Sequence, residues 1–155
     1  MKYPYILTVI FAAAVVTSCL LGYIPWLMAL IFLVISGLTF WVYAADKRAA
    51  QAGSWRVPEK RLQLLSLCGG WPGAVIAQET LRHKTRKMDF RIIFWFTVLL
   101  NISGFAWLHS TQGQGYLRHG VALLENALTD HVASPETMVA VLLLTRYPGR
   151  KNTGL

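Results

Sequence analysis

LQLLSLCGGWPGAVIAQETL, residues 62–81, is the stretch that decides the fold. Its apolar part, Leu64 to Ala77, is only 14 residues long. As a helix it would cover about 21 Å, short of the roughly 30 Å needed to cross a membrane. Glycines and a proline in the middle weaken helix formation and remove a backbone donor. We therefore predict a broken re-entrant hairpin of two half-helices, with its tip at Gly69, Gly70, Pro72 and Gly73.

Three longer uncharged blocks flank this stretch and predict membrane-spanning helices. They are Tyr5–Leu21 with 17 residues, Trp26–Ala45 with 20 and Ile92–Leu108 with 17. With 55% hydrophobic and 14% charged residues, the chain is too apolar for an ordinary soluble domain. We expect an all-α polytopic membrane helix bundle with three spans plus the re-entrant hairpin, or four spans if residues 62–81 cross as a kinked helix. A cleavable signal peptide is the competing interpretation of the first block.

Positive charge is concentrated on both sides of the predicted hairpin. Ten of the 15 Lys and Arg residues lie in two basic windows, residues 45–61 and 82–91. Positive charge beside membrane spans accumulates on the cytoplasmic side, and a full crossing between the windows would separate them. Because a hairpin leaves both windows on one side, we expect a multi-pass protein of the plasma membrane whose basic loops are cytoplasmic.

The C-terminal part of the chain has an amphipathic pattern. Leu117, Val121, Leu124 and Leu128 recur at helical spacing, and Ser134-Pro135 is a typical helix start. The apolar run after this start is too short to span a membrane. We therefore divide the chain into a membrane helical domain, 1–109, and a tail, 110–155, whose short amphipathic helices lie at the membrane interface or dock on the bundle.

Four short motifs occur in order between Tyr43 and Ile93. They are Asp46-Lys47-Arg48-Ala49, Trp55-Arg56-Val57-Pro58-Glu59, Gly69-Gly70-Trp71-Pro72-Gly73-Ala74, and Arg82-His83-Lys84-Thr85-Arg86-Lys87 with Phe90. With these motifs the chain resembles the domain of unknown function 1294 family of small bacterial integral membrane proteins. The resemblance covers residues 43–93, under half of the chain, and implies a protein of the bacterial inner membrane. It implies no reaction, because the family has no established activity.

Basic residues on both sides of the hairpin would converge when it closes. The candidates for binding a phosphate-bearing lipid head group are Lys47, Arg56, Lys60, His83, Lys84, Arg86 and Lys87. Arginine suits phosphate as a planar fork of donors and lysine as a point charge. We therefore expect either a scaffold or interaction protein, or a module that binds membrane lipids, anionic ones in particular. In the scaffold interpretation, Asp46 or Glu59 pairs with Arg56 and ties the loop down.

A small membrane-embedded enzyme is the alternative function. It would use His83 as general base, oriented by Asp46 or Glu59, on a phosphate-bearing or lipid substrate. The sequence has no nucleophile elbow, phosphate-cradling glycine loop or paired histidines at metal spacing, which weighs against an enzyme. We expect no cofactor and no metal site.

Three further expectations concern partners and cysteines. Nucleic acid is disfavoured as a partner because stacking aromatics are scarce in the basic windows. A homo-oligomer is plausible, since small residues of the hairpin offer a close-packing face. Cys19 and Cys68 have no paired spacing, so we interpret both as small buried hydrophobic residues.

Overall fold

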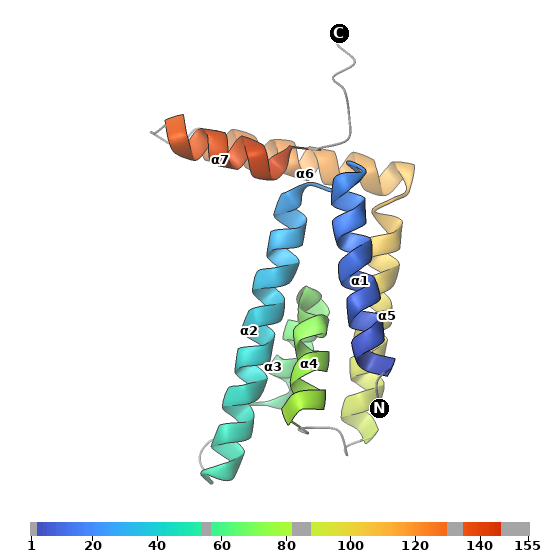
Figure 1. Cartoon of the computed structure of the whole chain (residues 1–155), viewed down its shortest axis with the longest axis vertical. Helices are drawn as coiled ribbons and strands as arrows, with labels where there is room; N and C mark the ends of the chain where they lie inside the picture. Colours follow the sequence, from blue (N-terminus) through green and yellow to red (C-terminus); the bar gives the residue numbers. More distant parts are fainter. Residues whose placement is uncertain (1–2, 54–56, 82–87, 130–134, 147–155) are drawn as a thin grey trace. The chain divides into compact units, whose positions relative to one another are not determined.

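The computed structural model describes residues 3–53, 57–81, 88–129 and 135–146, which form helices and turns with no strand among them. Three helices are long and apolar enough to cross a membrane: α1 (Tyr3–Leu20), α2 (Trp26–Gln51) and α5 (Met88–Trp107) (Figure 1). The predicted all-α membrane fold with three spans is thus confirmed.

The spanning helices keep most of their apolar surface on the outside. In the most apolar part of α2, only 11% of the residues are buried inside the structure. Leu33 and Trp41 on this helix are 70% and 63% exposed. Soluble monomers rarely expose continuous apolar surface on this scale, whereas lipid covers it at no cost. The exposure pattern therefore matches a helix that faces hydrocarbon.

The α2 and α5 helices extend further into the basic windows than the uncharged blocks indicate. α2 continues past Ala45 to Gln51, and α5 begins at Met88 instead of Ile92. The first charged residue ended each predicted span, but Ala, Lys, Arg and Gln are good helix formers and carry α2 onward. Charged residues at both helix ends are thereby held on regular backbone.

Between these two spans lies a hairpin of short helices. It consists of α3 (Glu59–Leu65), a π-helical turn η1 (Ser66–Gly70) and α4 (Trp71–Leu81). Inside η1, Gly69 has a φ of 103°, a conformation that side chains other than glycine rarely adopt. The chain changes direction at this residue, and Figure 1 shows α3 and α4 leading to and from the turn.

The hairpin tip packs tightly against the middle of α2. Gly73, in the first turn of α4, lies so close to α2 that an added Cβ would collide with the Ser36 carbonyl. At Gly69 an added Cβ would touch the Phe32 ring at 3.0 Å. Gly69, Gly70, Gly73 and Ala77 are all buried within the chain. The small-residue face that suggested self-association is therefore occupied by an intramolecular helix contact.

By its contacts the chain divides into two compact units, which cut through α1, α2 and α5. The first contains the residues through Ile10 together with Ile31–Gly104, and the second contains Phe11–Leu30 together with the residues from Phe105 onward. The first unit has the larger buried core. Its fully enclosed side chains include Tyr43, Leu62, Trp71 and Phe90. These come from α2, α3, α4 and α5, so the hairpin is the centre of that core.

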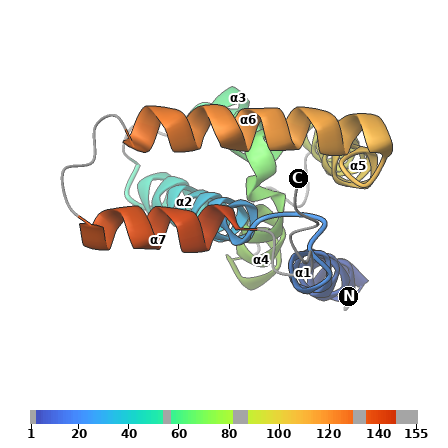
Figure 2. The ribbon, with the colours of Figure 1, turned by 90° about the horizontal axis from the view of Figure 1, so that it is seen from above.

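The second unit contains α6 (Thr111–Thr129) and α7 (Pro135–Thr145). Figure 2 shows α7 returning alongside α6. Within this unit the Ser18 hydroxyl donates to His109 Nε2 at 2.9 Å, because His109 Nδ1, at 2.9 Å from the Phe105 carbonyl, carries the ring proton. This hydrogen bond ties the end of α1 to the end of α5. The sequence did not predict this contact, which joins residues 91 apart.

The two cysteines have different environments. Cys19 is fully buried, as predicted, and packs near the turn between α1 and α2. Cys68 is exposed, contrary to the prediction. It lies in η1, where the backbone leaves the regular helical path and carries this side chain to the outer surface.

Candidate functional site

The end of α2 holds the first basic window in place through a buried carboxylate. Asp46 is completely enclosed, and its Oδ1 accepts a hydrogen bond from the Val57 backbone N–H at 3.0 Å. Although these residues are 11 apart in sequence, the bond holds Val57, just ahead of α3, against α2. Pro58 then precedes the first helical residue, Glu59, an arrangement that favours helix initiation.

Two backbone carbonyls at the break in the hairpin accept hydrogen bonds from α5. The Asn101 amide nitrogen lies 3.3 Å from the Ser66 carbonyl oxygen and 3.0 Å from that of Leu67. It also lies 2.8 Å from the carbonyl oxygen of Thr97 on its own helix. Unpaired backbone groups at membrane depth are costly, and irregular backbone survives there only where protein satisfies it. The Asn101 amide provides these hydrogen bonds.

A second bond joins α3 to the start of α5. The Gln63 amide nitrogen on α3 donates to the Phe90 carbonyl oxygen on α5 at 2.9 Å. The Phe90 ring meets the Tyr43 ring of α2 edge-on, with centroids 6.4 Å apart. Helix α3 and the first turn of α5 are thereby held together.

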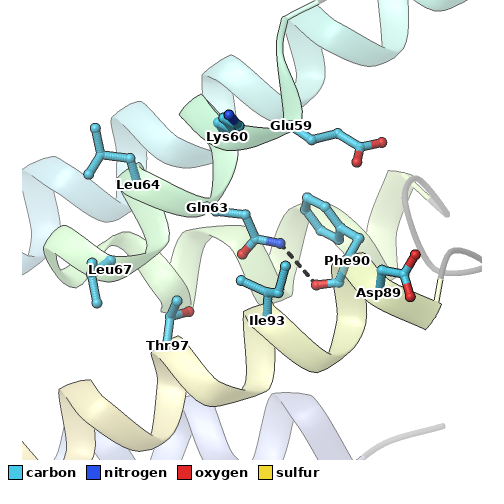
Figure 3. A pocket seen from close by; sticks show the side chains of 9 residues that line it. All are labelled: Glu59, Lys60, Gln63, Leu64, Leu67, Asp89, Phe90, Ile93 and Thr97. Carbon is cyan, nitrogen blue, oxygen red and sulfur yellow. Dashed lines mark hydrogen bonds between the residues drawn. The ribbon is translucent and has the colours of Figure 1, made fainter.

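A pocket of about 410 Å³ lies between α3 and α5, and we call it the α3–α5 pocket. Its residues are Glu59, Lys60, Gln63, Leu64, Leu67, Asp89, Phe90, Ile93 and Thr97. Figure 3 shows the carboxylates of Glu59 and Asp89 at one end, beside Phe90, and Leu64 and Leu67 toward the other end. The pocket thus has a charged mouth at the level of the basic windows and apolar walls that extend toward the hairpin tip.

The structure places only part of the predicted site. Lys47 is half-buried on α2, and Lys60 is exposed in the first turn of α3, where it lines the α3–α5 pocket beside half-buried Glu59. Five predicted phosphate-binding residues lie outside the described residues: Arg56, His83, Lys84, Arg86 and Lys87. The roles of these five residues therefore remain sequence predictions.

Of the three catalytic candidates, the structure describes two. Asp46 has no exposed surface and accepts a backbone hydrogen bond, whereas Glu59 is half-buried at the pocket mouth. His83 lies outside the described residues. Across residues 3–53, 57–81, 88–129 and 135–146, no group of three or more His, Cys, Asp or Glu side chains is placed to hold a metal ion.

Sequence reasoning missed three partly or fully buried amides of the first unit. Gln63, Gln78 and Asn101 each interrupt an otherwise apolar run, and each is at least partly buried in the first unit. A lone amide in an apolar stretch was the available signal, since polar side chains inside membrane helices are expensive and usually bond across helices. Gln63 bonds to a residue 27 positions away, and Asn101 bonds to one 35 positions away. Sequence spacing therefore did not reveal these partners.

Residues 36–90 match the family described as "Protein of unknown function (DUF1294)". Over this segment, about a third of its length, the chain is similar to the DUF1294 family. The boundaries of the DUF1294 segment agree with the geometry: it begins at Ser36, which touches Gly73, and ends at Phe90, which accepts from Gln63. The segment is therefore the part of the chain that closes on itself through the hairpin.

One relative of the DUF1294 segment is "Uncharacterized protein YsdA" of Bacillus subtilis (strain 168). The two are 42% identical over 52 residues, which is 34% of this chain and 58% of the relative. The match thus spans less than two thirds of the relative's length. No solved structure gives a significant match to the chain.

Proposed function

We propose that this chain is a bacterial inner-membrane protein that binds a phospholipid through its phosphate-bearing head group on the cytoplasmic side. In this proposal the hairpin of α3 and α4 enters the membrane from that side and returns to it. The positive-inside tendency supports the orientation, because both basic windows adjoin the base of the hairpin. The lipid is the nearest phosphate-bearing ligand to such a site.

The α3–α5 pocket is the observation that carries this proposal. An acyl chain needs an apolar groove open to the bilayer, and Leu64, Leu67 and Ile93 provide one. A phosphate needs a cation at head-group depth, and Lys60 supplies one at the mouth. The pocket exists because the Gln63–Phe90 bond draws α3 against α5, so the closure of the hairpin also builds the binding site.

The surrounding charge supports an anionic head group. Window 45–61 has five basic and two acidic residues, and window 82–91 has five basic and one acidic residue. Each cation near an anionic leaflet contributes on the order of 1 kcal/mol before acidic neighbours are subtracted. Glu59 and Asp89 at the pocket mouth reduce this attraction locally without reversing the positive balance of the windows. No observation in the described part of the chain favours the enzyme alternative.

Lys60→Ala is expected to weaken the binding of phosphatidylglycerol to the purified full-length chain about fivefold, the equivalent of about 1 kcal/mol. Leu64→Trp, which fills the apolar part of the pocket, is expected to weaken it at least as much. The measurement is native mass spectrometry from mild detergent with titrated lipid. Arg61→Ala is the matched control, because Arg61 is an exposed neighbour on α3 that does not line the pocket.

The expected result for Arg61→Ala is a change of no more than about twofold, from the long-range charge alone. Equal weakening by Lys60→Ala and Arg61→Ala would assign the attraction to diffuse charge and remove the α3–α5 pocket as the site. Failure to retain any phospholipid would leave the scaffold function in its place.

A further inference from the structure

A second pocket, of about 260 Å³, lies between α4 and α5 near the start of α1, and we call it the α4–α5 pocket. Val75, Phe94 and Trp95 provide apolar and aromatic walls, and Gln78, Glu79 and Arg91 provide polar groups. Pro4 of α1 closes one side. All of these residues belong to the first unit, and none of them lines the α3–α5 pocket.

Gln78 is the least expected residue in this pocket. The side chain is only 8% exposed, and its amide nitrogen is enclosed without a hydrogen-bond partner. The Gln78 side chain nevertheless lines the pocket. A buried unpaired donor is unfavourable, and an apolar side chain of similar size would avoid it. The amide is therefore a polar group of the pocket whose presence packing alone does not explain.

The two charged residues of the pocket have opposite signs. Arg91 is exposed and Glu79 is half-buried, and both line the pocket. The Arg91 guanidinium has the geometry to bind phosphate oxygens with two parallel hydrogen bonds. The Glu79 carboxylate and the Gln78 amide oxygen are both acceptors, which suits a primary ammonium with its three N–H donors.

We propose that the α4–α5 pocket binds the head group of an aminophospholipid, in which a phosphodiester is joined to a primary ammonium. Arg91 holds the phosphate, Glu79 and Gln78 accept from the ammonium, and the acyl chains leave along Phe94 and Trp95. The inference rests on the proposed function only for the membrane placement of the first unit. Its site and its selectivity differ from those of the α3–α5 pocket, where no such pair of ammonium acceptors faces a single arginine.

The test compares three lipids with matched acyl chains on the full-length chain in detergent, by native mass spectrometry. Phosphatidylethanolamine is expected to bind at least fivefold more tightly than phosphatidylcholine, whose quaternary ammonium has no N–H donor. Phosphatidylglycerol, the third lipid, measures binding at the α3–α5 pocket, because its head group has no ammonium. Soluble glycerophosphoethanolamine, which lacks acyl chains, is expected to bind at least tenfold more weakly than the intact lipid.

Glu79→Gln is expected to reduce the preference for phosphatidylethanolamine over phosphatidylcholine to less than twofold, with phosphatidylglycerol binding unchanged. Asp89→Asn is the control, because Asp89 is an acidic residue that lines only the other pocket, and the preference should survive it. Arg91→Ala should weaken both zwitterionic lipids by a similar factor.

Equal binding of phosphatidylethanolamine and phosphatidylcholine by the unmodified chain, or a preference that survives Glu79→Gln, would overturn this inference. Equal binding of glycerophosphoethanolamine would overturn the assignment to a lipid. These outcomes leave phosphatidylglycerol binding intact, whereas failure of the proposed function removes it, so the two failures are distinguishable.

Discussion

Gly73→Leu is expected to prevent the hairpin from docking on α2. The Gly73 Cα lies against the Ser36 backbone carbonyl, and a single Cβ there already collides with it. Since the obstacle is backbone and not the end of a flexible side chain, α2 and α4 would have to separate. Overpacking by even a few atoms costs about 1–3 kcal/mol, so we expect Gly73→Ala to lose that amount and Gly73→Leu to lose more.

The measurement is thermal unfolding in detergent, followed by tryptophan fluorescence, since Trp71 is fully buried beside the substituted residue. Gly37→Ala is the matched control. Gly37 lies next to Ser36 on α2, but an added Cβ there meets nothing within 4 Å. Alanine is the better helix former by about 1 kcal/mol, so Gly37→Ala should be neutral or stabilising. A Gly73→Leu protein as stable as the unmodified chain would show that α4 does not contact α2.

Asp46→Ala is expected to release the first basic window from the end of α2. The variant removes the acceptor of the Val57 N–H and leaves that donor without its partner. A hydrogen bond to a charged group contributes about 1.5–3 kcal/mol, and the loss falls in this range or above it because the Asp46 side chain is fully enclosed. Faster protease cleavage between α2 and α3 should accompany the lower unfolding temperature.

Asp46→Asn separates the hydrogen bond from the charge. Asparagine keeps an acceptor oxygen at the same position and should retain more than half of the stability lost in Asp46→Ala. If Asp46→Asn is as unstable as Asp46→Ala, the negative charge itself is required and the carboxylate has a cationic partner. If neither variant is destabilised, Asp46 does not anchor the segment, and its proposed structural role is wrong.

Much of the fold could be predicted from the sequence because membrane helices follow from simple physical limits. The lengths of the uncharged runs predicted α1, α2 and α5. The glycines and proline between Gly69 and Gly73 predicted the break in the hairpin. Amphipathic spacing located α6, and a serine-proline helix start located α7. Each of these signals is local, so it can be found without knowing which segments touch.

The contacts that build the pockets could not be predicted, because they join distant residues. Asn101 satisfies the carbonyls of Ser66 and Leu67 across 35 and 34 residues, and nothing in the sequence assigns that amide to that break. The basic charge of Lys60 made it a predicted site residue. Gln63 and Gln78 line the two pockets but carry no charge, so they were not predicted. Polar residues buried in apolar runs were therefore the more informative class of residue.

The central claim is that the hairpin returns the chain to the side from which it came. Single cysteines at Ala52, Met88 and Tyr116, all exposed positions, test it most directly in a background without Cys19 and Cys68. A membrane-impermeant maleimide applied to intact cells should label Tyr116→Cys, while Ala52→Cys and Met88→Cys should react only after permeabilisation. Labelling of one of these two from outside, with protection of the other, would show that residues 62–81 cross the membrane and would contradict the account.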